Sequence, residues 1–298
     1  MKNQSYLKVW LAEIRANFLI LSVVLVMIGG TAARYHGSFH PGLFIITLLG
    51  IVFAHISVNL FNEYSDWKTG IDFQTNRTPF SGGSGMLQQK LLYPRHVKTA
   101  SWITLFGAFL IGLMLAWISG WPVLVFMIIG GLTTIFYTDF LTRYMIGELA
   151  SGITLGSLVV IGTYFVQTSA VSSEIIWASI SPGILTMLLL FLNEFPDAEA
   201  DIAGGRRHMV IVLGKHKAAY VYTLLLLTVY VVIIGGVIFG ELPLAALISL
   251  VTLPLAAIVS WKTIKYKENN GKLIPALGMN VAIVLVTDFL MALSFIIA

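Results

Sequence analysis

The carboxylates of this chain gather in a motif that occurs twice. Residues 62–66 read Asn-Glu-Tyr-Ser-Asp and residues 193–197 read Asn-Glu-Phe-Pro-Asp, so both have the form Asn-Glu-aromatic-x-Asp. The two copies and the acids that follow them hold half of the fourteen carboxylates: Glu63, Asp66, Asp72, Glu194, Asp197, Glu199 and Asp201. Carboxylates held close together repel one another, and a divalent cation removes that penalty. The duplication therefore indicates cation binding rather than two unrelated solvated helix ends.

The spacing predicts that each motif lies along one face of a helix. Asn62 and Asp66 are four residues apart, and Asn193, Asp197 and Asp201 repeat that interval. Residues three or four apart share a helix face. Oxygen ligands in a chain without cysteine favour Mg²⁺, which accepts carboxylates together with substrate phosphates. The candidate metal ligands, with Glu63 and Glu194 in supporting positions, are Asn62, Glu63, Asp66, Asp72, Asn193, Glu194, Asp197 and Asp201.

Glycines and arginines accompany both motifs. Arg77 precedes a Gly- and Ser-rich segment that ends at Gly85, and Arg206 and Arg207 follow two glycines after the second motif. Converging backbone N–H groups and bidentate guanidinium groups bind phosphate oxygens. Acids beside arginines therefore predict a metal-bridged diphosphate, held by Arg77, Arg206 and Arg207. Lys68 is a weaker candidate, because an exposed loop lysine explains it equally well.

The elements that position these residues are membrane spans. Of 298 residues, 57% are hydrophobic and 11% charged, whereas a soluble domain carries about 25% charged residues. This composition excludes a soluble or a disordered protein. A helix of about 20 apolar residues crosses a membrane, and we predict an all-α integral membrane protein with nine transmembrane helices around a central cavity. The expected spans are about 16–34, 42–62, 99–119, 122–138, 146–167, 175–195, 218–239, 242–261 and 274–297.

The basic residues predict the orientation. With nine spans, all but one of the 18 Lys and Arg residues fall on one side, and only Arg34 falls on the other. Because such residues concentrate on the cytoplasmic side, we expect a multi-pass protein of the cell membrane with a cytoplasmic N-terminus and an outer C-terminus. Residues 1–298 form one expected domain, with functional cytoplasmic loops at about 63–98 and 196–217. Pro196 is expected to kink or end the helix before the second loop.

These motifs resemble those of the UbiA superfamily of intramembrane prenyltransferases. Residues 62–66 are similar to that family's Asn-Asp-x-x-Asp motif, and residues 197–201 to its Asp-x-x-x-Asp motif. Glu63 stands where Asp is usual, and Asp72 follows two residues later than the family's last Asp. Further segments resemble the menaquinone branch of 1,4-dihydroxy-2-naphthoate polyprenyltransferases, with His208 where that branch has Thr: 77–83, 137–138, 147–149, 162–168 and 205–214.

The resemblance implies transfer of a polyprenyl chain from its diphosphate to an aromatic carbon. Two Mg²⁺ ions would stabilise the departing diphosphate, with Asp66 and Asp197 as central ligands. Tyr137 is the candidate for stabilising an allylic cation by its aromatic face, and Arg143 for holding the carboxylate that a naphthoate acceptor loses as CO₂. The implied partners are a polyprenyl diphosphate, an aromatic acid and the lipid bilayer. No nucleic acid is expected, and the oligomeric state is left open.

Other functions remain open at this stage. The resemblance favours 1,4-dihydroxy-2-naphthoate, in menaquinone biosynthesis, as the acceptor, with 4-hydroxybenzoate or homogentisate as alternatives, and tail length does not follow from the sequence. A cation-coupled transporter is a different class, but transporters usually place coupling acids near the bilayer midplane. A lipid phosphotransferase also uses Mg²⁺ and clustered Asp, but its Asp-Gly-x-x-Ala-Arg pattern is missing. Asp288 and His55 are intramembrane polar residues whose roles stay open.

Overall fold

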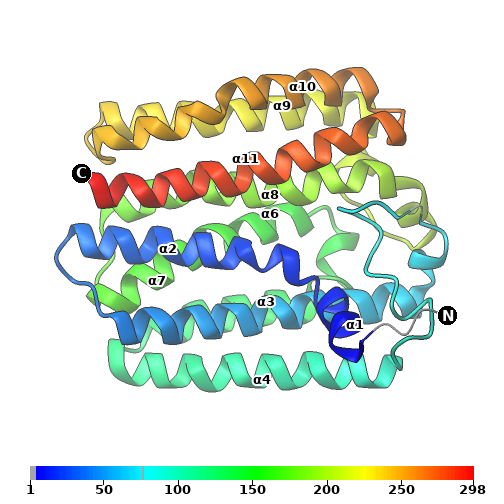
Figure 1. Ribbon diagram of the computed structural model, residues 1–298, viewed down its shortest axis with the longest axis horizontal. Helices are drawn as coiled ribbons and strands as arrows, with labels where there is room; N and C mark the ends of the chain where they lie inside the picture. The colour runs from blue at the N-terminus through cyan, green and yellow to red at the C-terminus, as the bar shows by residue number, and fades with distance from the viewer. Residues whose placement is uncertain (1–4, 76) are drawn as a thin grey trace.

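The computed structural model describes residues 5–75 and 77–298, and these form a bundle of roughly parallel helices joined by loops (Figure 1). The α-helices are α1 (Tyr6–Glu13), α2 (Ile20–Tyr35), α3 (Pro41–Thr69), α4 (Pro94–Ser119), α5 (Pro122–Phe136), α6 (Gly147–Ser151), α7 (Leu158–Thr168), α8 (Ser173–Ala203), α9 (Met209–Ile238), α10 (Leu253–Tyr266) and α11 (Asn270–Ile297). Tighter or wider turns form η1 (Ala16–Phe18), η2 (Ile71–Phe73), η3 (Leu141–Arg143), the π-helical η4 (Gly152–Ser157) and η5 (Leu244–Thr252).

Within the described residues, eight helical stretches are long and apolar enough to cross a membrane. The predicted all-helical architecture with membrane-spanning helices is therefore confirmed. The remaining expected span, 122–138, corresponds to α5, which has 15 residues. At about 1.5 Å per residue such a helix reaches about 22 Å, short of a hydrocarbon core of about 30 Å. The count of nine spans stays a prediction.

The expected span 146–167 is built from three consecutive pieces, α6, η4 and α7. Glycines let its first half approach α8 closely, since a Cβ on Gly152 would meet the carbonyl oxygen of Gly183 at 2.6 Å. Small residues are the usual means of bringing two apolar helices into contact. This contact places the start of α6 beside the polar end of α8.

The second loop is shorter than the sequence suggested. α8 passes through Pro196 and ends at Ala203, and α9 begins at Met209. Of the expected loop 196–217, only residues 204–208 and Gly214, where α9 is kinked (φ +73°), are non-helical. Proline removes one backbone hydrogen bond of a helix, and α8 continues past it. As a result Asn193, Asp197 and Asp201 belong to one helix and keep the four-residue spacing.

The bundle places its polar loops and its C-terminus at opposite ends. The loop between α3 and α4, the short loop between α8 and α9, and helix α1 lie together at one end, whereas α11 finishes at the other end (Figure 1). The main apolar core includes large side chains from α8 and α9, such as Phe191 and Tyr222. By contrast, α4 exposes Ile103, Phe106 and Trp117 on its outer surface. An apolar outer surface of this kind suits contact with lipid.

Candidate active site

A cavity of about 590 Å³ opens between the helices. Apolar side chains from α3, α4, α5, α7 and α8 form most of its wall, including Ile51, Phe109, Phe126 and Leu189. At the end of the bundle that carries the polar loops, the wall is polar instead and includes Asn62, Asp66, Asp72, Asn193, Glu194, Asp197, Asp201, Arg206 and His208. The two copies of the acidic motif therefore share one cavity.

The end of α3 folds back so that Asp72 joins the first motif. Gly70 closes the helix with φ +80°, in the left-handed region that glycine adopts without strain. The chain then turns through η2, and Asp72 faces the cavity. Gly83 of the following loop approaches so closely that a Cβ there would meet Oδ2 of Asp72 at 2.6 Å. Asp72 lies two positions after Gly70, the position at which the family motif has its last Asp. This turn brings Asp72 to the site.

The first loop is fastened to both acidic motifs by its backbone. The N–H of Gly82 donates to Oδ2 of Asp197 at 3.1 Å, and the N–H of Ser84 donates to both oxygens of Glu63 at 2.9 Å. Hydrogen bonds from backbone N–H groups to a buried carboxylate are strong, because the acceptor is charged. Glu63, expected as a supporting ligand, is thus engaged in holding the loop.

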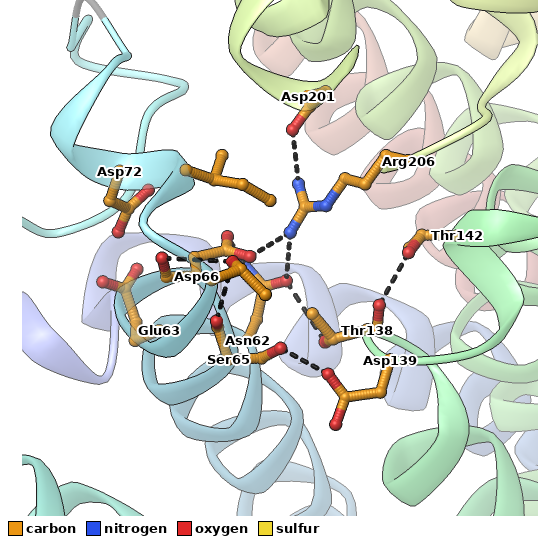
Figure 2. Close-up of polar contacts among 12 residues, drawn as sticks. Asn62, Glu63, Ser65, Asp66, Asp72, Thr138, Asp139, Thr142, Asp201 and Arg206 are labelled. Atoms are coloured by element: carbon orange, nitrogen blue, oxygen red, sulfur yellow. Dashed lines mark hydrogen bonds and ion pairs between the residues drawn. The ribbon is translucent and has the colours of Figure 1, made fainter. Parts of the chain in front are cut away.

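Arg206 lies between the two motifs (Figure 2). Its guanidinium donates to Oδ1 of Asp201 at 2.9 Å and pairs with Oδ1 of Asp66. Burial opposes its charge, but the neighbouring Asp66 and Asp201 outweigh this effect and raise the pKa of Arg206 above its ordinary value. The side chain is 16% exposed, so this cation is a fixed part of the cavity wall.

In the remaining acids, burial and neighbouring carboxylates make the charged form unfavourable. Burial, followed by the charges of Asp66 and Glu63, raises the pKa of Asp72 to about 8. Oδ1 of Asn193 and Oδ1 of Asp197 are buried without a hydrogen-bond partner among the described residues. Apart from Arg206 and His208, the polar side chains on this part of the wall offer oxygen atoms. A set of carboxylate and amide oxygens with unpaired members fits a hard divalent cation such as Mg²⁺.

The expected diphosphate-binding cations occupy different places. Arg206 lines the cavity, whereas the described side chains of Lys68, Arg77 and Arg207 are exposed and do not line it. Arg77 instead donates through Nε to the carbonyl of Gly82 at 3.3 Å, within its own loop. Arg143 is also exposed and borders a small neighbouring pocket with Asp139. Tyr137, in contrast, lines the main cavity beside the acids.

Two functional candidates were missed in the sequence. Arg15 is one of the basic residues from which the orientation was predicted, but its backbone is left-handed (φ 53°) and its side chain lines the cavity with His55 and Asn59. Glu13 is fully buried, and its Oε2 accepts a 2.6 Å hydrogen bond from Ser84. A carboxylate at the end of a short basic amphipathic helix gives no local signal of burial, since the loop that covers it lies some 70 residues later.

The other intramembrane polar residues are separate from the acids. His55 hydrogen bonds to the hydroxyl of Ser22 at 2.8 Å while it lines the cavity, and Nδ2 of Asn59 donates to the carbonyl of Ile14 at 3.0 Å. Asp288 is buried in α11 and does not line the described cavity, and both its oxygens lack a partner among the described residues. The structure assigns Asp288 no place in this site.

Comparison with known proteins points to one family. Residues 22–283 match the UbiA prenyltransferase family. The chain is 31% identical over 235 residues to the 1,4-dihydroxy-2-naphthoate octaprenyltransferase of Bacillus subtilis. The alignment covers 76% of this chain and 72% of the Bacillus protein.

Solved structures share the fold. The apo structure of a UbiA homolog from Aeropyrum pernix aligns with a TM-score of 0.69 at 17% identity, over 94% of this chain and 98% of that one. A UbiA homolog from Archaeoglobus fulgidus bound to GPP and Mg²⁺ aligns with a TM-score of 0.55 at 12% identity, over 95% and 99%. The chain is therefore a member of the UbiA prenyltransferase family and a prenyltransferase enzyme, as its motifs suggested.

Proposed function

We propose that this chain transfers a polyprenyl group from its diphosphate to 1,4-dihydroxy-2-naphthoate, a reaction of menaquinone biosynthesis, with Mg²⁺ as cofactor. The observation that carries the proposal is the meeting of both acidic motifs and Arg206 at one end of an otherwise apolar cavity. An isoprenoid diphosphate has the same division into a charged head and an apolar tail. The name of the Bacillus relative favours the naphthoate acceptor, and the GPP and Mg²⁺ in the Archaeoglobus homolog favour the donor and the cofactor.

The residues that would hold the cation are Asn62, Asp66, Asp72, Asn193, Asp197 and Asp201. When bound there, Mg²⁺ would neutralise the diphosphate charge that develops as the prenyl C–O bond breaks. We assign two ions to the site because each motif supplies its own set of oxygens. Glu63 and Glu194 are left in supporting roles, since Glu63 is already occupied by Ser84.

The chain's own groups bind and orient the donor. Arg206 is the cation that meets the diphosphate, because it lines the polar end of the cavity. Lys68, Arg77 and Arg207 would reach the diphosphate only if their exposed side chains moved. The apolar wall holds the tail and excludes water from an allylic cation. The ring of Tyr137 lies on the same wall, where its face would attract that cation.

We place the acceptor on the α3 side of the cavity, where Arg15, His55 and Asn59 line the wall. In the reaction a new carbon–carbon bond forms, pyrophosphate leaves with the electron pair of the C–O bond, and the acceptor's carboxylate departs as CO₂. An arginine is suited to hold that carboxylate. Arg15 lines the cavity whereas Arg143 does not, so we assign the carboxylate to Arg15. Arg143 is left as a residue of η3 that borders the small neighbouring pocket.

We also propose an orientation of the chain in its membrane. We infer nine spans in the cell membrane, with α5 as the short span and the acidic end facing the cytoplasm, because nearly all basic residues share that side. The whole chain, 1–298, then acts as one prenyltransferase domain. Its functional loops are the segment between α3 and α4 and the segment 204–208. A site at the membrane surface favours an enzyme over a transporter, whose acids would lie near the midplane.

A direct assay tests the proposal. Purified protein in detergent is incubated with Mg²⁺, a polyprenyl diphosphate and, separately, 1,4-dihydroxy-2-naphthoate, 4-hydroxybenzoate or homogentisate, and products are identified by mass spectrometry. We expect a decarboxylated prenyl-naphthalenediol with the first acceptor and no product when EDTA is present. A product with 4-hydroxybenzoate alone would replace the naphthoate assignment, and no product with any acceptor would contradict the proposed reaction.

A further inference from the structure

Beside the acidic site lies a second group of buried ligand-type side chains. Glu148 lies in the first turn of α6, Glu194 lies in α8, and His208 immediately precedes α9, so the three residues come from separate parts of the chain. One ligand atom from each residue lies within 4.8 Å of the others. The three residues are 0%, 8% and 2% exposed. Sequence reasoning named Glu194 as a supporting ligand of the acidic site and gave Glu148 and His208 no role.

Three of the atoms in this cluster have no hydrogen-bond partner. Among the described residues, Oε2 of Glu148, Oε2 of Glu194 and Nδ1 of His208 are buried and unpaired. Leaving a buried polar atom without a partner is unfavourable, and for a carboxylate it is more so. Two carboxylates that face each other with unpaired oxygens repel, and either a shared proton or a cation between them relieves the repulsion. Arg206 is not that cation, because its hydrogen bonds go to Asn62, Asp66 and Asp201.

In His208 and Glu148, the second polar atom of the side chain already has a hydrogen-bond partner. Nε2 of His208 hydrogen bonds to Oδ2 of Asp201 at 3.1 Å, and Oε1 of Glu148 accepts the N–H of Met209 at 2.5 Å. A histidine that binds a metal through one ring nitrogen usually gives its other N–H to a carboxylate or carbonyl. With its proton on Nε2, His208 directs the lone pair of Nδ1 towards Glu194.

The spacing inside the cluster also fits a shared cation. Nδ1 of His208 and Oε2 of Glu194 are 3.4 Å apart and do not hydrogen bond. Two ligands about 2.1 Å from a tetrahedral zinc ion lie about 3.4 Å from each other. An imidazole beside two carboxylates suits a divalent transition metal, whereas Mg²⁺ prefers oxygen alone. The acidic site, with its oxygen donors, and this cluster, with its nitrogen donor, therefore differ in the metal they select.

We propose that Glu148, Glu194 and His208 form a binding site for a divalent transition-metal ion such as Zn²⁺, separate from the Mg²⁺ ligands of the acidic site. Glu194 and His208 both line the cavity, so a fourth ligand position faces it. The ion joins the start of α6, the polar end of α8 and the start of α9. It thereby fixes the short loop 204–208, which carries Arg206.

The test measures metal content and does not depend on prenyl transfer. Protein with its affinity tag removed is dialysed against EDTA, loaded with Zn²⁺ in the presence of excess Mg²⁺, desalted and analysed by mass spectrometry of the elements. We expect about one zinc ion per chain in the wild type. His208→Asn and Glu148→Gln should bind Zn²⁺ at least about tenfold more weakly. Co²⁺ in place of Zn²⁺ should give the visible absorption of a tetrahedral site in the wild type but not in these two variants.

Matched variants separate this site from its surroundings. His216 is an exposed histidine of α9, and His216→Asn should retain the zinc. Asp197→Asn, which alters the acidic site, should also retain it, even if prenyl transfer is lost or was never present. The proposal is overturned if the wild type holds no zinc after loading, or if His208→Asn holds as much as the wild type. If Glu148→Gln fails to fold, the comparison of His208→Asn with His216→Asn decides the matter.

Discussion

Arg206, which follows the second acidic motif, pairs with Asp66 of the first motif, 140 residues earlier in the chain. The connection is made a second time in the opposite direction, because Gly82 of the first loop donates to Asp197 of the second motif. Each motif is thus held by a residue that follows the other. Neither acidic motif has all its hydrogen bonds without the other, so we expect a substitution in one motif to displace side chains of the other.

Replacement of Asp197 tests the assignment of the acids. Asp197→Asn keeps the size of the side chain and the acceptor for Gly82 but removes the charge that a divalent cation requires. We expect product formation to fall by at least about 100-fold, the range typical of a lost electrostatic group in an active site. Glu199→Gln is the matched control, because Glu199 is an exposed acid of the same helix. Unchanged turnover in Asp197→Asn, measured by product mass spectrometry, would remove this residue from the metal site.

Replacement of Arg206 should affect both activity and stability. Arg206→Gln leaves Asp66 and Asp201 without their cation. Breaking a buried ion pair by removing one partner costs about 3–5 kcal/mol, so we expect a lower Tm in detergent, together with a loss of activity. Added Mg²⁺ should restore more of the Tm in the variant than in the wild type, because the freed carboxylates bind it.

Arg207→Gln is the control for this prediction, since Arg207 is the adjacent residue and its side chain is exposed. It should keep both Tm and turnover near the wild-type values. Equal losses in the two variants would show that the effect comes from the loop as a whole and not from the buried guanidinium.

Two glycines with similar backbones test the close approach of the first loop. Gly83 has φ +71° and Gly37 has φ +75°, so alanine is strained at both. A Cβ at position 83 would also meet Asp72 at 2.6 Å, whereas position 37 has no neighbour within 4 Å. Gly83→Ala should therefore reduce turnover by about tenfold or more through displaced Asp72, and Gly37→Ala should reduce only Tm. Similar kinetics in the two variants would contradict a catalytic role for this approach.

The sequence was sufficient for features set by local spacing. The four-residue intervals of Asn62 with Asp66, and of Asn193, Asp197 and Asp201, predict one polar face on each helix, and the structure has both faces on one cavity. Long apolar segments likewise predict the helices themselves. These features depend on helical periodicity and on composition, which neighbouring residues determine.

Features that depend on contacts between residues far apart in the chain could not be predicted from the sequence. The burial of Glu13 requires a loop that includes Ser84, and the entry of Arg15 into the cavity requires a left-handed residue between α1 and α2. Glu148 and Glu194 meet where glycines of η4 and α8 lie in close contact, just after α6. Conversely, Arg77 and Arg207 follow the acids in sequence as Arg206 does, yet only Arg206 turns inward. Adjacency in sequence does not fix which side of a loop a side chain takes.

Stability should depend on pH through Glu13. Burial first, and then the charge of Glu63, raises the pKa of Glu13 from 4.5 to about 7. The folded state therefore favours the protonated acid, and this contribution is complete below pH 4.5 and lost as the pH rises through 7. It amounts to roughly 3 kcal/mol, at about 1.4 kcal/mol per pKa unit. Tm measured in detergent should fall between pH 5 and 8 less steeply in Glu13→Gln than in the wild type, and parallel curves would exclude Glu13 as the cause.

The acceptor site is tested by the two arginines that compete for its carboxylate. Arg15 lines the cavity beside His55 and Asn59, and one of its Nη atoms also donates to the carbonyl of Phe80 at 3.3 Å. Arg15→Gln removes the positive charge, so we expect the KM for 1,4-dihydroxy-2-naphthoate to rise by about tenfold or more, the worth of one charge-assisted hydrogen bond. The KM for the polyprenyl diphosphate should change much less, because that substrate's charge lies at Arg206 and the acids.

Arg143→Gln provides the comparison. Arg143 is exposed and borders a separate small pocket, so its loss should leave the acceptor KM within about twofold of the wild type, as expected for an exposed charge that is screened by solvent. An acceptor that lacks the carboxylate should bind the wild type and Arg15→Gln equally, since the guanidinium then has no partner. If Arg143→Gln raises the acceptor KM and Arg15→Gln does not, the acceptor enters from the η3 side, and the assignment of its carboxylate to Arg15 is wrong.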